Sequence, residues 1–398
     1  MTRVLFCVIP EKGHLNPYIG PAQALQALGA EVAFHAGADI SAQLRAAGIE
    51  RFVGPRVSPP GDTHRGAAFA ARVRDAAWLR QWIKTLLVDA AEDAIGPLRA
   101  VIRDIRPDVV AIDPMVYAAA IACELEGVPW AAISNSLNPV LPDELDSELL
   151  RTVRWLAPDR DALFSRHGVT AWFRGCDLLS PHLTIAFTTG ALVGPAPGVE
   201  LVGPSLPRGA RGDEVAFPWD WLDPPGGAPG SAGRPLVYCS FGSQIYHQPA
   251  LFRCVLEAVA DQPVQLVVSA SDLALGPVPR NVLVRPYVPQ LALLRRASVL
   301  ITHGGANSVM EAIACGVPIL IAPLCNDQFH QVHFIERAGI GRVFDRDAVW
   351  PAIAALVAAG PERARMAAVS ASYQRDGAAE TARLLSELAA GSRRARGS

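Results

Sequence analysis

The sequence predicts an α/β protein built from two doubly wound domains, each with a parallel sheet that helices cover on both faces. Short apolar runs alternate with helical patterns along both halves of the chain, and this alternation is typical of parallel sheets. The length of 398 residues suits two domains. Between the halves lies a segment rich in Pro, Gly and Ser, residues 206–235, which we expect to be a surface linker.

The N-terminal domain is expected to span residues 1–205. Its predicted strands are residues 4–9, 31–35, 51–53, 109–112 and 130–134. Its predicted helices are residues 17–28 and 116–126, with a long helical region over 67–105 that we expect to break near Gly96-Pro97. Residues 137–179 show no regular pattern. Ligands of such folds lie at the carboxyl ends of the strands, so the strand-to-helix loops are where chemistry is expected.

The C-terminal domain is expected to span residues 236–375. Its predicted strands are residues 236–241, 264–268, 282–284, 299–302 and 319–322. Its predicted helices are residues 251–259, 291–296 and 308–315, and further helices follow to the end. Residues 376–398 are predicted to be a C-terminal helix and tail that can return to pack on the N-terminal domain.

The composition argues against several classes of function. The formal net charge of −2, from 36 basic and 38 acidic residues, argues against a nucleic-acid partner. The seven cysteines include no CxxC pair, which argues against a disulfide framework or a thiolate metal site and favours a reducing, cytoplasmic compartment. No apolar stretch is long enough to span a bilayer. The apolar N-terminus ends at Pro10 and is predicted to be a buried strand, not a signal peptide.

A histidine and an aspartate follow two predicted strands of the first half. His14 comes after the first strand, where a general base would be useful; the alternative is that it caps the helix or bonds to backbone. Asp113 follows the strand 109–112, where it could orient an imidazole as in a catalytic triad; the alternative is a helix N-cap before Pro114. Because parallel strands open on one edge of a sheet, we predict a His14–Asp113 pair.

In the second half, a predicted strand runs directly into His303-Gly304-Gly305 and a helix start. Backbone N–H groups and the helix dipole make such a loop an anion cradle, and glycines let a diphosphate approach the backbone. The alternative is an ordinary helix entry, because Ser308 and Glu311 also match a capping box. No Lys follows the glycines, so this is not a Walker loop.

Two further loops reinforce this cradle. Gly242 and Ser243 follow the strand 236–241, and Asp327 and Gln328 follow the strand 319–322. A carboxylate beside a carboxamide offers acceptors and donors that suit sugar hydroxyls. Each pair also consists of routine turn residues. No cluster of Asp, His or Cys has metal-ligand spacing, so no metal is expected.

Taken in order, these segments resemble the metal-independent nucleotide-sugar glycosyltransferases that include plant and bacterial natural-product glucosyltransferases. The resemblance covers nearly the whole chain. Its strong part is Val288-Pro289-Gln290, then His303 to Ser308 with Glu311, then Asp327-Gln328; Gly13-His14-x-x-Pro17 matches the family's N-terminal motif. The resemblance implies the glycosyltransferase-B fold, in which two Rossmann-like doubly wound domains face each other across a cleft.

The resemblance also implies a role for each residue. His14 would be the base that deprotonates the acceptor hydroxyl, and Asp113 would be its orienting partner. The other residues would bind the donor: Gly242, Ser243, His303, Gly305, Asn307 and Ser308 at the diphosphate, Glu311 at the ribose, Val288 and Gln290 near the base and ribose, and Asp327 and Gln328 at the sugar.

The donor and the stereochemistry follow from the same resemblance. Plant members often place Trp near where Val288 stands, and its absence leaves uridine versus deoxythymidine open. The Asp327-Gln328 pair is similar to that of hexose users, which implies UDP-glucose or a related UDP- or dTDP-hexose as a substrate, with no cofactor. A single displacement would invert the anomeric configuration.

The implied acceptor is a lipophilic small molecule bound by the N-terminal half. Aromatic and apolar residues there are more often core than pocket, yet this much aromatic surface suits a lipophilic aglycone. They are Trp78, Leu79, Trp82, Leu86, Trp155, Trp172 and Phe173.

Other functions stay open at this point. They are a nucleotide-sugar epimerase on the same architecture, a non-catalytic nucleotide-sugar-binding protein, and a dehydrogenase, which the missing GxGxxG disfavours. His14 and Asp113 argue against a pure binder. The sequence allows a monomer or a homodimer.

Overall fold

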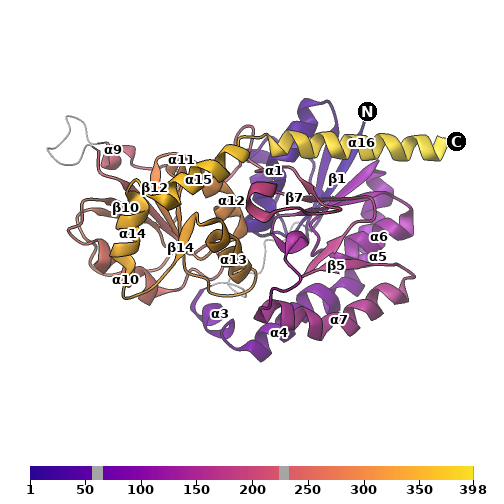
Figure 1. Ribbon diagram of the computed structural model, residues 1–398. Helices are drawn as coiled ribbons and strands as arrows, with labels where there is room; N and C mark the ends of the chain where they lie inside the picture. Colours follow the sequence, from indigo (N-terminus) through magenta and orange to yellow (C-terminus); the bar gives the residue numbers. More distant parts are fainter. Residues whose placement is uncertain (56–65, 224–232, 398) are drawn as a thin grey trace. The chain divides into compact units, whose positions relative to one another are not determined.

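The computed structural model describes residues 1–55, 66–223 and 233–397, and the chain divides into two compact units (Figure 1). The first unit comprises Met1–Gly61, Val73–Gly212 and Arg375–Ser398, and the second Asp62–Arg72 and Asp213–Gln374. The first unit therefore extends past residue 205, and a short segment of the first half belongs to the second unit. Among the described residues, no helix is long and apolar enough to cross a membrane.

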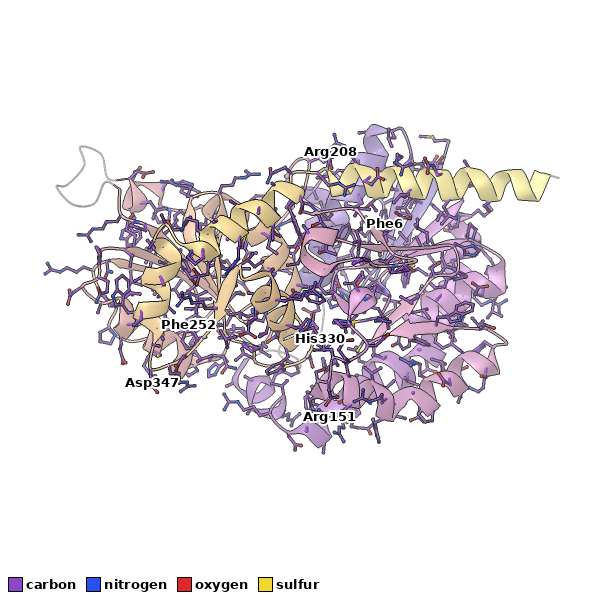
Figure 2. The ribbon with its side chains drawn as sticks, in the orientation of Figure 1. Phe6, Arg151, Arg208, Phe252, His330 and Asp347 are labelled. Carbon is purple, nitrogen blue, oxygen red and sulfur yellow. The ribbon has the colours of Figure 1, made fainter. Side chains whose placement is uncertain are left out.

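A six-stranded parallel sheet forms the centre of the N-terminal unit, in the order β2-β1-β3-β4-β7-β8. Its strands are β1 (Arg3–Cys7), β2 (Glu31–His35), β3 (Val109–Ile112), β4 (Trp130–Ser134), β7 (Leu183–Ala186) and β8 (Glu200–Leu201). Phe6 of β1 stacks on Phe34 of β2, with ring centroids 4.8 Å apart (Figure 2). The expected strand at 51–53 is a single bridge between Phe34 and Phe52.

Helices surround this sheet. They are α1 (Lys12–Ala27), α2 (Ser41–Ala46), α4 (Ala76–Lys84), α5 (Ala90–Ile105), α6 (Tyr117–Glu126), α7 (Glu148–Arg166), α8 (Gly190–Val193) and α16 (Gly377–Gly397), with a π-helical turn η1 (Thr85–Asp89) and a 3₁₀ turn η2 (Asn138–Val140). A separate hairpin consists of β5 (Trp172–Arg174) and β6 (Asp177–Leu179). The C-terminal helix α16 contacts α1 and β3 of this unit (Figure 1).

Helix α1 starts earlier than the sequence predicted, so His14 lies in its first turn and not in a loop. Pro17 lies inside this helix. A proline has no N–H, so the carbonyl of Gly13 loses its helical partner. The Asn135 side chain takes that place, with its Nδ2 donating to Gly13 O at 3.3 Å.

The long helical region of the first half breaks at other places than predicted. Asp75 caps α4 by accepting hydrogen bonds from the amides of Ala77 and Trp78 at 2.9 and 3.2 Å. Pro97 lies inside α5, so the break predicted at Gly96-Pro97 is wrong. The carbonyl that Pro97 leaves without a helical partner belongs to Asp93, an exposed residue that water can reach.

Helix α7 occupies residues for which the sequence showed no regular pattern. The Ser147 side chain caps it by accepting from Leu150 N at 3.2 Å. Pro158 lies in the middle of the helix, and a proline there is ordinarily read as a helix end. Ser147, a residue type that is common at helix N-caps, was the sequence feature that could have indicated the start of α7.

The C-terminal unit contains a second six-stranded parallel sheet, in the order β11-β10-β9-β12-β13-β14. Its strands are β9 (Leu236–Ser240), β10 (Gln265–Ser269), β11 (Val282–Arg285), β12 (Ala297–Thr302), β13 (Ile319–Ile321) and β14 (Gly341–Val343). Its helices are α3 (Gly66–Arg72), α9 (Trp219–Leu222), α10 (Pro249–Val259), α11 (Gln290–Leu294), α12 (Ala306–Ala314), α13 (Gln328–Ala338), α14 (Val349–Val357) and α15 (Pro361–Ser372). Helix α9 lies within the expected linker, of which residues 224–232 are outside the described part of the chain.

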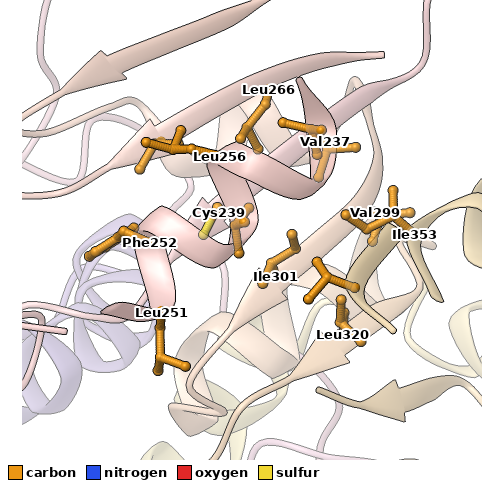
Figure 3. Close-up of a cluster of buried hydrophobic side chains, with 14 of the residues drawn as sticks. Val237, Cys239, Leu251, Phe252, Leu256, Leu266, Val299, Ile301, Leu320 and Ile353 are labelled. Atoms are coloured by element: carbon orange, nitrogen blue, oxygen red, sulfur yellow. The ribbon is translucent and has the colours of Figure 1, made fainter. Parts of the chain in front are cut away.

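An apolar core fixes the strands of this second sheet (Figure 3). Phe252 and Leu256 of α10 belong to one buried cluster with Cys239 of β9, Leu266 of β10 and Ile301 of β12. Each fully buried side chain of this size stabilises the fold by about 1.5–3 kcal/mol. The core thereby holds β9 beside β12, the two strands whose following loops are expected to bind the donor.

Both sheets are doubly wound, with the strand order reversing between β1 and β3 in one unit and between β9 and β12 in the other. Ligands of such sheets bind at this switch point, beyond the carboxyl ends of the strands. His14 and Asp113 follow β1 and β3, and Gly242 and His303 follow β9 and β12. Each predicted pair of loops therefore flanks the switch point of its own unit.

Candidate active site

The structure pairs the two expected catalytic residues of the N-terminal unit. His14 Nδ1 lies 2.6 Å from Asp113 Oδ2, and the carboxylate is fully buried while the imidazole is 26% exposed. The other carboxylate oxygen accepts from Met115 N at 3.1 Å. Neither residue occupies the N-cap position that the alternatives required, because the N-cap residues are Glu11 in α1 and Val116 in α6.

The partners of His14 determine which ring nitrogen carries the proton. A carboxylate only accepts, so Nδ1 must donate to Asp113, and the lone pair then lies on Nε2. Asn135 Nδ2 lies 3.0 Å from the same Nδ1 and 3.3 Å from Gly13 O. Because a protonated Nδ1 cannot accept, we assign the Asn135 hydrogen bond to Gly13 O. The arrangement leaves Nε2 as the basic nitrogen.

In the C-terminal unit, the ring of His303 lies against two glycines from different loops. A Cβ atom added to Gly242 would lie 2.7 Å from His303 Cε1, and one added to Gly305 would lie 2.8 Å from His303 Nε2. Both distances are shorter than real Cβ contacts, so both positions require glycine. The loops after β9 and β12 therefore meet around one imidazole.

The same loop leaves the start of α12 open to an anion. Burial lowers the pKa of His303 to about 4, so the ring is neutral near pH 7. No side chain caps α12, whose N-cap residue is Gly305, and the N–H groups of a first turn point out of the helix end. Ser308 lies inside the helix, so the capping box with Glu311 does not form.

Four of the expected donor-binding residues form one hydrogen-bond network around buried Glu311. Gln290 Nε2 donates to Glu311 Oε2 at 2.7 Å, and Asn307 Nδ2 donates to Glu311 Oε1 at 3.0 Å. Gln290 Nε2 also lies 3.3 Å from Ser308 Oγ, and Gln290 Oε1 accepts from the Tyr238 hydroxyl at 3.0 Å. These hydrogen bonds fix the position of the Glu311 carboxylate, the group that the resemblance assigned to the ribose.

The loop before α13 holds the Asp327-Gln328 pair. Gln328 is buried, and its Oε1 accepts from Leu324 N at 2.8 Å and Cys325 N at 3.1 Å. Gln328 therefore shapes its own loop. Asn326 adopts a left-handed φ of +54°, and its buried Oδ1 has no hydrogen-bond partner among the described residues. An orphaned carbonyl thus stands next to Asp327.

The aromatic residues expected near the acceptor are divided between core and surface. Trp78 and Trp82 of α4 stack with ring centroids 6.0 Å apart. Phe173 of β5 packs against other rings of the N-terminal unit. Trp155 of α7 and Trp172 of β5 are 45% and 52% exposed.

Several known proteins are similar to this chain. The family model described as "UDP-glucoronosyl and UDP-glucosyl transferase" matches residues 227–348. The chain is 28% identical to demethyllactenocin mycarosyltransferase of Streptomyces fradiae, over 81% of this chain and 71% of that protein. It is 26% identical to 4'-demethylrebeccamycin synthase of Lentzea aerocolonigenes, over 85% and 86%. The chain is thus similar to natural-product glycosyltransferases over most of its length, and we identify it as a glycosyltransferase.

Similarity to solved structures identifies the fold of this glycosyltransferase. The glycosyltransferase of kitacinnamycin matches with a TM-score of 0.73 and 24% identity, over 97% of this chain and 98% of that chain. The glycosyltransferase VinC in complex with dTDP matches with a TM-score of 0.71 and 22% identity, over 98% and 99%. The predicted glycosyltransferase-B class, with two Rossmann-like α/β domains, is confirmed.

Several polar and aromatic residues near the candidate site of this glycosyltransferase were not predicted from the sequence. Asn135 follows β4 and contacts His14, and its position at a strand end was the available signal. Tyr238 lies within an apolar strand, where nothing marked its hydroxyl. Tyr287 directly precedes Val288 and is 43% exposed. From the sequence, an aromatic residue was considered only at position 288, and Tyr287 lies one position before it.

Proposed function

We propose that this glycosyltransferase transfers glucose or a related hexose from a UDP- or dTDP-sugar to a hydroxyl of an apolar small molecule, with inversion and without a metal. The observation that carries the proposal is the 2.6 Å contact between His14 Nδ1 and Asp113 Oδ2. The similarity to glycosyltransferases favours transfer over epimerisation and over binding without catalysis.

In the proposed reaction, His14 Nε2 takes the proton of the acceptor hydroxyl. The acceptor oxygen attacks the anomeric carbon, and the bond from that carbon to the diphosphate oxygen breaks. One displacement inverts the configuration, so an α-linked donor gives a β-glycoside. Asp113 stabilises the imidazolium that forms. A placed base of this kind contributes about 10²–10⁴-fold in rate.

The start of α12 would take the charge of the leaving nucleoside diphosphate. First-turn N–H groups supply hydrogen bonds to the diphosphate oxygens. The one N–H of neutral His303 can donate either to a diphosphate oxygen or to the backbone of Ser240. Among the described residues no group of His, Cys, Asp and Glu could hold a metal ion. We expect EDTA to leave the turnover number unchanged. A loss of turnover that magnesium restores would assign the leaving-group role to a metal instead.

The choice of sugar and base is the finer part of the proposal. Asp327 is proposed to accept from sugar hydroxyls, and Asn326 adds a second acceptor beside it. Tyr287 is proposed to stack on the nucleobase, since an exposed ring beside Val288 suits either uracil or thymine. Relatives use deoxysugars, so hexose preference is tested directly by offering UDP-glucose, dTDP-glucose and a dTDP-deoxysugar.

The test uses a panel of donors and lipophilic phenolic or alcoholic acceptors, with the products identified by mass spectrometry. His14→Ala should lower turnover by at least about 10²-fold while the affinity for UDP or dTDP stays near normal. His182→Ala is the matched control, because His182 is an exposed histidine of the same unit. Retained turnover in His14→Ala would show that His14 is not the general base. Faster transfer from the deoxysugar donor than from the glucose donors would show that the preferred sugar is a deoxysugar.

A further inference from the structure

A buried arginine of the N-terminal unit is not used by the proposed reaction. Arg160 of α7 is 8% exposed. Its Nε and Nη1 atoms are buried and have no hydrogen-bond partner among the described residues. Its Cζ lies 3.6 Å from the ring centroid of Phe173 in β5. The guanidinium hydrogen-bonds to the Tyr117 side chain, whereas its Nε and Nη1 nitrogens have no partner among the described residues.

The burial of this charge is only partly compensated, because the side chain that hydrogen-bonds to the guanidinium is the neutral phenol of Tyr117. Desolvation of a buried ion costs several kcal/mol, and a cation–π contact returns only about 0.5–2 kcal/mol. Within the described part of the chain no carboxylate lies within ion-pair distance of Arg160. The neighbouring hairpin carries Asp177, whose oxygens accept from Asn138 Nδ2 at 2.8 Å and from the hydroxyls of Ser134 and Ser136.

The hairpin above Arg160 connects it to the catalytic pair. The hydroxyl of Tyr117, the first residue of α6, donates to Cys176 O at 2.6 Å, and its ring packs on Phe173 at 5.3 Å. Leu178 N donates to Pro114 O at 3.1 Å, directly after Asp113. The hairpin therefore packs on the loop that carries Asp113.

A second orphan lies under the same hairpin. Asn138 is buried, and its Oδ1 has no hydrogen-bond partner among the described residues. Gly175, in the hairpin turn, leaves the room for it, because a Cβ there would lie 2.9 Å from Asn138 Oδ1. Asn138 and Arg160 thus contact different parts of the hairpin, Asn138 at its turn residue Gly175 and Arg160 at Phe173 of β5.

We propose that Arg160 binds a carboxylate of the acceptor molecule, so that this enzyme prefers acidic acceptors over neutral ones of the same shape. The inference rests on the proposed function only in placing the acceptor in the N-terminal unit. Arg160 is a binding residue here and takes no part in proton transfer. A ligand carboxylate supplies the acceptors that Nε and Nη1 lack. The competing explanation is an ordered water that satisfies the guanidinium as a structural element.

The first measurement needs no ligand. Arg160→Met keeps the apolar stem and removes the charge, so the melting temperature of the ligand-free protein should stay the same or rise. Arg166→Met is the matched control, because Arg166 is an exposed residue of the same helix. A fall of more than about 4 °C in Arg160→Met alone would indicate about 1 kcal/mol or more of structural stabilisation, and would overturn the proposal.

The second measurement is calorimetric binding of 4-hydroxycinnamate and of its uncharged amide, with no donor present. The wild type should bind the carboxylate at least about tenfold more tightly than the amide, Arg160→Met should lose this preference, and Arg166→Met should keep it. Equal binding of the two probes by the wild type, or a preference that survives in Arg160→Met, would overturn the proposal. Because no turnover is measured, failure of the base or the hexose assignment leaves this result unaffected.

Discussion

At the scale of single residues, one carboxylate decides which nitrogen of His14 can act as a base. Asp113 is fully buried and fixes the proton on Nδ1 through the 2.6 Å contact. Asp113→Asn keeps the shape but can offer an N–H to Nδ1, which would turn the lone pair toward residue 113. We expect turnover to fall by about 10²–10⁴-fold.

The measurement is steady-state turnover with the donor and acceptor at saturation, together with the affinity for the nucleoside diphosphate. The affinity should be unchanged, since Asp113 belongs to the N-terminal sheet. Turnover within threefold of the wild type would show that the tautomer is set by another group.

A second residue-scale constraint is the absence of a side chain at Gly305. A Cβ there would meet His303 Nε2 at 2.8 Å, so Gly305→Ala must displace the imidazole. We expect affinity for UDP or dTDP to fall at least tenfold, by about 1.4 kcal/mol, with little change in melting temperature. Gly360→Ala is the control in the same unit, because its Cβ would make only ordinary contacts, at 3.7 Å or more. Equal affinities in the two variants would contradict the cradle.

At the scale of elements, the loop between β13 and α13 depends on Gln328. Its Oε1 accepts from the amides of Leu324 and Cys325, and an unpaired buried amide costs about 1–3 kcal/mol. Gln328→Met should therefore lower the free energy of unfolding by about that amount and weaken both sugar transfer and diphosphate binding. Gln328→Glu keeps the acceptor oxygen and should restore stability.

Transfer rates of the Gln328→Met and Gln328→Glu variants then distinguish a structural role of Gln328 in the loop from a role in binding the sugar. If Gln328→Glu recovers stability and transfer together, the side chain serves the loop. If stability returns while hexose transfer stays low, the lost Nε2 donor contacts the sugar, as the sequence predicted. Asp327→Asn provides the comparison, because it should weaken transfer of the hexose more than binding of free diphosphate.

The buried strands were predictable because parallel strands covered on both faces are short apolar runs, and β2, β3 and β4 match their predicted bounds. Helix boundaries were harder to predict from the sequence than strand boundaries. The start of α1 was misplaced because Pro17 looks like a first helical residue, whereas the Asn135 side chain compensates for its missing hydrogen bond. Asn135 follows β4, far along the chain from α1, so no local sequence pattern contains this compensation.

For the molecule as a whole, the proximity of candidate site residues was predictable where parallel strands bring the loops that follow them to one edge of a sheet. Strand order places the loops after β9 and β12 side by side, so Gly242 and His303 could be named from the sequence. The contacts of Tyr238 and Arg160 depend on side-chain packing between elements, which periodicity does not encode. The pairing of His14 with Asp113 was predictable in part. The shared sheet edge predicts that the two residues are near each other, whereas the 2.6 Å contact between Nδ1 and Oδ2 is known only from the structure.

The stability of the whole molecule should depend on pH through two histidines of the C-terminal unit. Burial lowers the pKa of His303 to about 4, and burial together with His333 lowers that of His330, on α13 in Figure 2, to about 4. In the unfolded chain both titrate near 6.5. Between these values the unfolded chain binds more protons than the folded one.

The stabilisation is therefore complete above about pH 6.5 and is lost as the pH falls toward 4, by up to about 3 kcal/mol for each histidine. Urea unfolding at pH 7.0 and pH 5.0 measures this loss. His330→Gln cannot be protonated, so its free energy of unfolding should fall less between the two pH values than that of the wild type. His182→Gln, at an exposed position, should follow the wild type. Parallel curves for all three proteins would show that acid sensitivity arises elsewhere, and a smaller loss in His330→Gln alone would assign that share of the acid sensitivity to the packing of α13.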